Sequence, residues 1–214
     1  MRFLISYFRK AGLRRILVST AGNLCIAAGV GIFKLSLLGN DPYSGMNMAL
    51  GALAGISYAN FQILLNLALL GVQLAVGRET VGYGTVFNAV TVGYVGTWVY
   101  QLGYRLLGEP GSLAAQLAVM LLGVAVTGLG VSLYQQARLG VSPYDAAALI
   151  FHKFARRIPY FWCRILTDAT CTLVCFLSGG LVGLGTLVTA LGLGPVITFF
   201  NRFVSDPTLR AGKE

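Results

Sequence analysis

Charged side chains are scarce in this chain of 214 residues. Asp, Glu, Lys and Arg make up 11% of it and hydrophobic residues 56%, whereas an ordinary soluble domain carries about 25% charged residues. So few charges cannot cover a globule that is surrounded by water, which excludes a soluble enzyme. The net charge of +9 does not indicate nucleic-acid binding, because the basic residues stand at the ends of apolar runs rather than on one soluble face.

Groups that carry metal or catalytic chemistry are also few. The chain has one histidine, His152, and four cysteines, with no Cys-x-x-Cys pair, so metal-ligand spacing is lacking. The cysteines lie inside apolar segments, as small packing residues do. No Ser-His-Asp constellation, pair of catalytic carboxylates or phosphate-binding loop is visible. We therefore expect no enzymatic activity, no metal and no cofactor.

Apolar runs take up most of the chain. Six of them reach the length of about 20 residues that a bilayer crossing requires; they cover about 16–38, 58–76, 84–106, 112–134, 158–177 and 184–204. The first run is too long for the apolar part of a cleavable signal peptide. Two shorter segments begin at Pro42 and Pro143, and proline is favoured in the first turn of a helix. This pattern predicts an all-α membrane protein with six transmembrane helices and two short half-helices.

The pattern occurs twice. The segments 38–43 and 139–144 share Leu-Gly-x-x-Pro-Tyr at an offset of 101 residues, and Gly84-Thr85 matches Gly185-Thr186 at the same offset. Each half is a span, a half-helix that begins with proline, and two further spans. The sequence therefore predicts a single membrane domain over residues 1–214. Its parts are repeat one at about 15–107, repeat two at about 112–204, and a cytoplasmic tail at 205–214.

Positive charges predict the topology, because cytoplasmic segments of membrane proteins carry an excess of Lys and Arg. If the N-terminus is cytoplasmic, the outer side holds only Lys34 and Arg105, and Arg164 lies within a span. Both termini are therefore predicted to be cytoplasmic. Three crossings per half is an odd number, so the two halves enter the membrane from opposite sides. The sequence thus predicts an inverted-topology internal repeat.

The two Leu-Gly-x-x-Pro-Tyr turns, the Gly-Thr segments that begin at Gly84 and Gly185, and the six-span length resemble the YczE-like bacterial membrane proteins, which are related to the YitT group. The resemblance covers roughly residues 15–204. It implies a small, transporter-like protein with several spans in the bacterial plasma (inner) membrane, and it implies no particular substrate.

Charged residues within a span are the sharpest candidates for a site. Arg164 and Asp168 are four residues apart, so they share one face of a helix, and charge inside a membrane marks a function or a compensating partner. At this point the matching register is 102 residues, since Tyr58 matches Tyr160. The counterparts Gln62 and Asn66 in the first half are also polar and four apart. Alternatively, Arg164 and Asp168 form an ion pair that only fixes packing, or Arg164 reaches to the cytoplasmic interface.

Two further acids, Asp41 and Asp145, stand at or just after the starts of the half-helices. Helix capping explains an acid there, and proton or cation coupling is the alternative. If both half-helices re-enter the membrane, their N-termini meet near its midplane, and free N–H groups favour an anion or a carboxylate. In the other arrangement both half-helices lie flat at the membrane interfaces.

We expect a transporter that moves a small anionic or zwitterionic solute by alternating access. The alternative is a non-transporting membrane subunit that binds a solute and needs an energising partner. The expected partners are the lipid bilayer and the solute, not nucleic acid, and a homo-oligomer or an energising partner subunit stays open. The predicted substrate-binding residues are Asn40, Asp41, Pro42, Tyr43, Gln62, Asn66, Ser142, Pro143, Tyr144, Asp145, Arg164 and Asp168.

Overall fold

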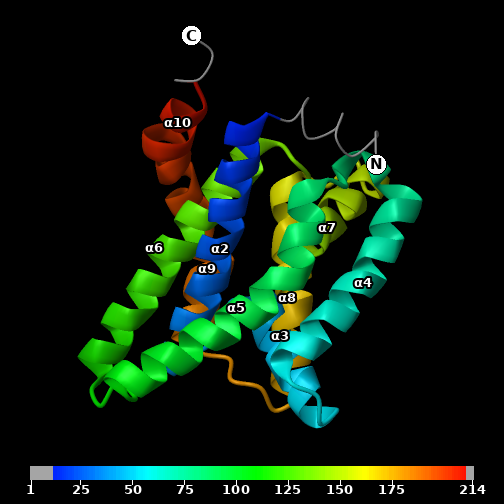
Figure 1. Cartoon of the computed structure of the whole chain (residues 1–214). Coiled ribbons are helices and arrows are strands. Elements are labelled where there is room, and N and C mark those ends of the chain that lie inside the picture. Colours follow the sequence, from blue (N-terminus) through cyan, green and yellow to red (C-terminus); the bar gives the residue numbers. More distant parts are fainter. Residues whose placement is uncertain (1–11, 211–214) are drawn as a thin grey trace.

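A computed structural model describes residues 12–210 as a bundle of helices (Figure 1). The elements in chain order are α2 (Leu13–Ser36), α3 (Pro42–Leu53), α4 (Tyr58–Val76), the 3-10 turn η1 (Arg78–Thr80), α5 (Tyr83–Leu107), α6 (Leu113–Ala137), α7 (Pro143–Phe154), α8 (Tyr160–Leu177), α9 (Leu184–Phe200), the π-helical turn η2 (Asn201–Ser205) and α10 (Asp206–Arg210). Over residues 12–210 every regular element is a helix or a helical turn, so the predicted all-helical class is confirmed.

Within residues 12–210, five stretches are long and apolar enough to cross a membrane: α2, α4, α6, α8 and residues 184–209. The span expected at 84–106 forms α5, a helix of 25 residues, but it is not one of those five. Its glycines, its tyrosines and Arg105 dilute the apolar residues. The protein is thus a membrane protein with several apolar helices.

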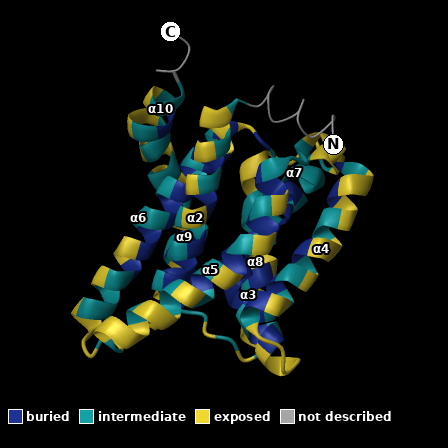
Figure 2. Ribbon diagram, in the orientation of Figure 1, coloured by how far each residue is buried: buried dark blue, intermediate teal, exposed yellow. Residues whose placement is uncertain are grey.

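The surface of the bundle is apolar, unlike that of a soluble protein, and the interior mixes apolar clusters with many polar groups. Large apolar side chains such as Leu107 and Trp98 lie exposed on the outside (Figure 2). The interior holds many buried amides and hydroxyls, including Asn23 and Asn88, whose side chains bond across α2 and α5 at 2.7 Å. Polar groups inside and apolar groups outside are the arrangement that a hydrocarbon environment favours.

The two half-helices begin where the sequence predicts, at Pro42 and Pro143, and each has 12 residues. The first ends at Leu53, and Gly55 with a φ of 65° closes the chain into a turn there. In Figure 1, α3 lies toward the lower end of the bundle and α7 toward the upper end. The ends of the described chain both lie at the upper end.

The C-terminal segment differs from the prediction. The sequence predicts that the last span ends near residue 204, but the helical backbone continues from α9 through η2 and α10 to Arg210. Asp206 and Pro207 stand at the first and second positions of α10, where both residue types are compatible with a helix. The polar composition therefore does not break the helix. The rest of the predicted tail, residues 211–214, and the basic N-terminal residues 1–11 lie outside the described part of the chain.

Each half binds the proline turn of the other half. The amide of Gly185 donates to the carbonyl of Leu38 at 2.7 Å, and the amide of Gly84 donates to the carbonyl of Leu139 at 2.8 Å. These two bonds join residues that match at the offset of 101. The repeated Leu-Gly-x-x-Pro-Tyr and Gly-Thr motifs are therefore the two sides of one contact that is made twice.

Two glycines allow this close approach. A Cβ atom on Gly82 would lie 2.2 Å from the carbonyl oxygen of Leu139, and one on Gly183 would lie 2.3 Å from that of Leu38. Both contacts are with backbone, which cannot rotate away as a side chain can. Only glycine fits at these two positions.

An exposed ion pair fastens η1 to α7. Lys153 Nζ lies 3.1 Å from Glu79 Oε1, and it also donates to the carbonyl of Val76 at 3.0 Å. The pKa of Glu79 lies below its ordinary 4.5, first because its own backbone N–H donates to the carboxylate and second because of Lys153. A lowered folded-state pKa stabilises the fold above the ordinary pKa, and this contribution is lost as the pH falls further.

We therefore expect Glu79→Gln to lower the melting temperature slightly at pH 7 and to leave it unchanged at about pH 3. Thermal unfolding of the detergent-purified protein at both pH values measures the difference. An equal loss at both pH values would mean that the charge of Glu79 is not what stabilises this contact.

Candidate functional site

The N-terminal ends of α3 and α7 meet at a cavity of about 90 Å³ inside the bundle. The rings of Tyr43 and Tyr144, the second residues of the two half-helices, are stacked with their centroids 4.4 Å apart. This stack places the starts of the two half-helices side by side. One buried water needs about 10–15 Å³, so the cavity has room for several waters or a small solute.

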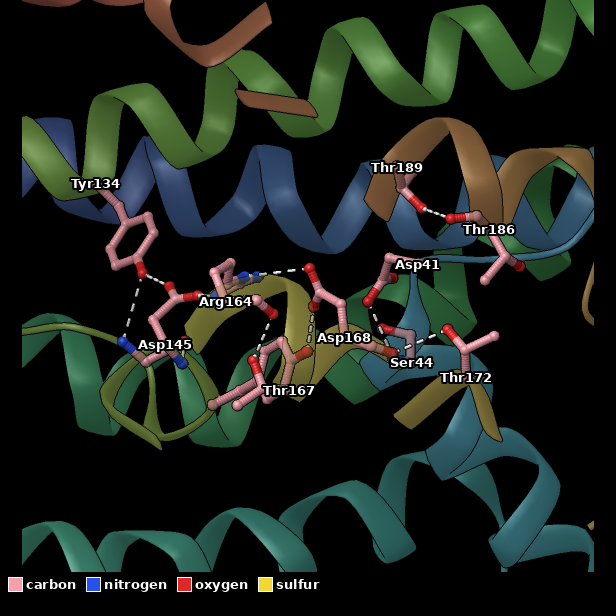
Figure 3. Close-up of polar contacts among 12 residues, drawn as sticks. Asp41, Ser44, Tyr134, Asp145, Arg164, Thr167, Asp168, Thr172, Thr186 and Thr189 are labelled. Carbon is pink, nitrogen blue, oxygen red and sulfur yellow. Dashed lines mark hydrogen bonds and ion pairs between the residues drawn. The ribbon is translucent and has the colours of Figure 1, made fainter. Parts of the chain in front are cut away.

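Arg164 on α8 joins two carboxylates at this cavity (Figure 3). Its Nη1 donates to Asp145 on α7, and its Nε lies 3.4 Å from Asp168 Oδ2 one turn along α8. Its guanidinium carbon lies 4.6 Å from the centroid of the Tyr144 ring. The predicted pair of Arg164 and Asp168 is therefore part of a network, and the guanidinium is held toward α7.

Two tyrosine hydroxyls complete this network. Tyr134 on α6 donates to Asp145, and Tyr144 donates to Asp168. Each carboxylate thus has both the guanidinium and a hydroxyl as partners. Buried charges are stable when they are paired and hydrogen-bonded in this way.

The starts of the half-helices are capped by their own side chains. Asp41 Oδ1 accepts from the Ser44 amide at 3.0 Å, and Ser142 Oγ accepts from the Asp145 amide at 3.1 Å. The first residue of each helix is proline, which has no N–H. In each half-helix the first residue therefore has no N–H, and the N–H of the third residue is capped. Few free N–H groups remain to bind an anion, contrary to the expectation from the sequence.

The structure places most of the predicted site residues on the cavity wall. Those that line it are Asp41, Pro42, Tyr43, Gln62, Ser142, Tyr144, Asp145, Arg164 and Asp168. Three predicted residues do not line it. Asn66 lies behind Tyr43 and accepts from its hydroxyl at 2.7 Å, Asn40 donates to the Val30 carbonyl at 3.2 Å, and Pro143 is buried. They position the cavity wall and do not form it.

Four polar residues beyond the twelve predicted substrate-binding residues also line the cavity. They are Ser44, Asn88, Thr127 and Thr189. Ser44 matches Asp145 at the offset of 101, and Asn88 matches Thr189, so the repeat itself carried a signal for three of them. The match of Thr127 is the apolar Ile26, also on the wall, and no polar pattern marks it.

The apolar residues on the cavity wall also match each other at the offset of 101. Val30 matches Val131, and Val92 matches Leu193, and all four line the cavity. Corresponding positions of the two halves therefore face each other across one internal space. The difference between the halves is chemical, because Arg164 and Asp168 in the second half stand where the first half has Gln62 and Asn66.

These features define a helical membrane protein of several spans with a charged internal cavity. Residues 13–202 match a family described as "Family of unknown function (DUF6198)", and the chain belongs to that family. The expected resemblance to YczE-like membrane proteins is thereby confirmed, since an "Uncharacterized membrane protein YczE" of Bacillus subtilis is 26% identical over 84% of this chain and 81% of its own length.

Two other relatives cover similar lengths. An uncharacterized protein of Haemophilus influenzae is 26% identical over 84% of this chain and 80% of its own length. The "Uncharacterized protein YyaS" of Bacillus subtilis is 23% identical over 86% of this chain and 90% of its own length. No solved structure matches the chain with significance. The similarity therefore extends over nearly the whole helical bundle.

Replacing Tyr144 by phenylalanine keeps the ring that stacks on Tyr43 and removes the hydroxyl that donates to Asp168. Hydrogen bonds to charged groups contribute about 1.5–3 kcal/mol, and we expect a loss of stability at the lower end because Asp168 keeps Arg164. Chemical denaturation in detergent measures it. Tyr94→Phe, which removes an exposed hydroxyl, serves as the matched control and should change stability little; equal losses in both variants would contradict the role given to Tyr144.

Proposed function

We propose that this protein is a transporter that moves a small zwitterionic solute across the bilayer by alternating access. The observation that supports it best is the cavity, where corresponding residues of the two halves surround one charged space. Transporters built from internal repeats bind their substrates at such a repeat interface, near broken or half helices. The charges on the cavity wall would hold the solute, with Arg164 and Asp168 among its contacts.

The topology in this proposal is an inverted repeat with six crossings. The opposite placement of α3 and α7 in Figure 1 supports it, as does the reciprocal bonding of Gly84 and Gly185. On this topology α5 is the sixth crossing. Both termini face the cytoplasm of a bacterium, in accordance with the distribution of Lys and Arg.

The charges on the wall favour a zwitterion over an anion. Asp41, Asp145 and Asp168 line the cavity together with a single basic residue, Arg164. A purely anionic solute would meet an excess of like charge at short range. A zwitterion offers its cationic group to the carboxylates and its anionic group to the guanidinium. The small volume of the cavity restricts the solute to a few non-hydrogen atoms.

Uptake by the purified protein in liposomes tests this proposal. A panel of small radiolabelled zwitterions, including amino acids and betaines, is compared with small anions of similar size. Saturable uptake of a zwitterion that Asp168→Asn strongly reduces would support the proposal. Saturable uptake of an anion alone would contradict the solute class, and no uptake from either panel would contradict the transporter itself.

The alternative is a membrane subunit that binds a solute and depends on an energising partner. Stable co-purification of a partner in mild detergent, together with solute binding but no uptake by the protein alone, would favour this alternative. We likewise propose that the protein performs no chemical catalysis. Its carboxylates at the cavity are engaged in pairing and capping, and an unchanged solute after transport would be the corresponding result.

A further inference from the structure

Asp41 differs from the other two carboxylates at the cavity. Asp145 and Asp168 both pair with Arg164, whereas Asp41 forms no ion pair with any residue in the described range 12–210. Its Oδ1 caps α3, but its Oδ2 is buried and has no hydrogen-bond partner. A buried carboxylate oxygen without a partner is costly inside a membrane. A positive charge bound at this oxygen would remove that cost.

Other oxygens surround this carboxylate. The hydroxyl of Ser44 lies next to Asp41, and the hydroxyl of Tyr58 has Asp41, Ser44 and Gln62 as polar neighbours. Gln62 is only 3% exposed, and both its Oε1 and the Tyr58 hydroxyl are buried without hydrogen-bond partners. Tyr58 and Gln62 are four residues apart on α4, so they lie on one face. Three unpartnered oxygens therefore gather at the start of α3.

In the second half, an arginine side chain supplies the positive charge beside the half-helix. Gln62 corresponds to Arg164, and Ser44 corresponds to Asp145, which the guanidinium of Arg164 contacts. In the first half a carboxylate, Asp41, is present beside Gln62, but no basic side chain is. At the position of the Arg164 guanidinium, the first half therefore has a neutral amide, and Asp41 Oδ2 has no positive partner of its own within residues 12–210.

We propose that Asp41, Ser44, Tyr58 and Gln62 form a binding site for a monovalent cation, Na⁺, which couples to solute movement. All four side chains offer oxygen, the ligand that hard cations take. One carboxylate balances one positive charge, whereas sites for divalent cations commonly use several carboxylates. A proton would satisfy Asp41 Oδ2 alone, but a metal cation contacts the oxygens of Tyr58 and Gln62 as well.

Thermal unfolding of the detergent-purified protein tests the site without solute and without transport. The probe is NaCl, exchanged for choline chloride at constant ionic strength and pH 7.5. We expect the melting temperature to rise with Na⁺ by several degrees and to saturate, since a ligand that binds only the folded state stabilises it. Asp41→Asn keeps the helix cap, because Asn caps as well as Asp, and it should lose the Na⁺ response.

Two further variants make the result decisive. Glu109→Gln removes an exposed carboxylate that does not line the cavity and should keep the full response. Gln62→Met removes one ligand oxygen at similar size, so it should shift the Na⁺ dependence to about tenfold higher concentration, which corresponds to 1.4 kcal/mol. If Asp41→Asn does not fold, the Gln62→Met titration decides alone.

A melting temperature that does not respond to Na⁺ would overturn the site. So would a response that survives in folded Asp41→Asn, or a dependence on pH without a dependence on Na⁺, which would assign a proton instead. The coupling role rests on the proposed function, and the two fail separately. Na⁺ stabilisation with no uptake, or with uptake that is independent of Na⁺, would leave the site and remove only its coupling role. Uptake by a protein whose melting temperature does not respond to Na⁺ would leave the transporter and remove the site.

Discussion

Replacing Arg164 by alanine should abolish solute binding and lower the free energy of unfolding by about 3 kcal/mol. Removing one partner of a buried ion pair commonly costs ~3–5 kcal/mol, because the other charge stays buried without compensation. Here two carboxylates, Asp145 and Asp168, would be left together. We expect the lower end of the range, since the guanidinium side chain is 30% exposed. Chemical denaturation and solute binding in detergent measure the two effects.

A second variant separates stability from binding. Arg164→Met combined with Asp145→Asn and Asp168→Asn removes the guanidinium and both charges that it compensates. Neutral replacement of a whole buried network is often well tolerated, so stability should largely return while solute binding stays lost. If Arg164→Ala bound solute normally, Arg164 would have only a packing role. If the triple variant regained binding, the charges would not be the binding groups.

Gly183→Ala should be among the most destabilising single substitutions outside the charged network. Its Cβ would lie 2.3 Å from the backbone carbonyl of Leu38, so the contact between the halves must separate. Overpacking typically costs about 1–3 kcal/mol, and we expect about 3 kcal/mol because backbone on both sides must move. Gly82→Ala, at 2.2 Å from the Leu139 carbonyl, should have an effect of the same size. Unfolding in detergent measures both.

The matched control is Gly71→Ala on α4, where a new Cβ would have no neighbour within 4 Å. Alanine is about 0.5–1 kcal/mol more favourable than glycine in a helix interior, so this variant should be neutral or slightly stabilising. A loss in Gly71→Ala as large as that in Gly183→Ala would contradict the role given to the contact between the halves.

The sequence was sufficient to predict the helices and their order. The span predicted at 58–76 coincides with α4, and the half-helices start at the predicted prolines. Hydrophobic length and proline position are local signals, and such elements can be located without knowledge of the fold. The helical backbone continues through Asp206 to Arg210 beyond the apolar run, because a change to polar composition ends an apolar run without ending a helix.

The site could be predicted in part, through the repeat. Arg164 and Asp168 were recognisable because charges within an apolar run are rare. Asp145, the second carboxylate that pairs with Arg164, is marked as a site residue in the sequence only by its place near the start of a half-helix. Its contact with Arg164 depends on how α7 packs against α8, which no local pattern encodes. Thr127 was not predictable, since it reaches the cavity only because α6 packs against α2.

The charge balance of the cavity could also not be predicted from the sequence. Free N–H groups at the half-helix starts suggested an anion, but capping by Asp41 and Ser142 uses them. Whether a capping side chain is present can be guessed from residue type. Which of its oxygens is left without a partner, as Asp41 Oδ2 is, requires the packed structure.

Accessibility of the cavity from the two sides of the membrane tests the proposed transport mechanism most directly. Thr189→Cys, on the cavity wall, is introduced after Cys25, Cys163, Cys171 and Cys175 are replaced by alanine. Leu107→Cys at the end of α5 and Phe154→Cys at the end of α7 serve as exposed references for the two ends of the bundle. A membrane-impermeant thiol reagent is then applied to oriented proteoliposomes from one side at a time.

Alternating access predicts that each reference cysteine is labelled from one side only, and from opposite sides. The cysteine at position 189 should be labelled from either side, and a bound solute should change the ratio of the two labelling rates. Labelling of position 189 from a single side, with no response to solute, would contradict alternating access and leave a binding protein whose cavity opens in one direction.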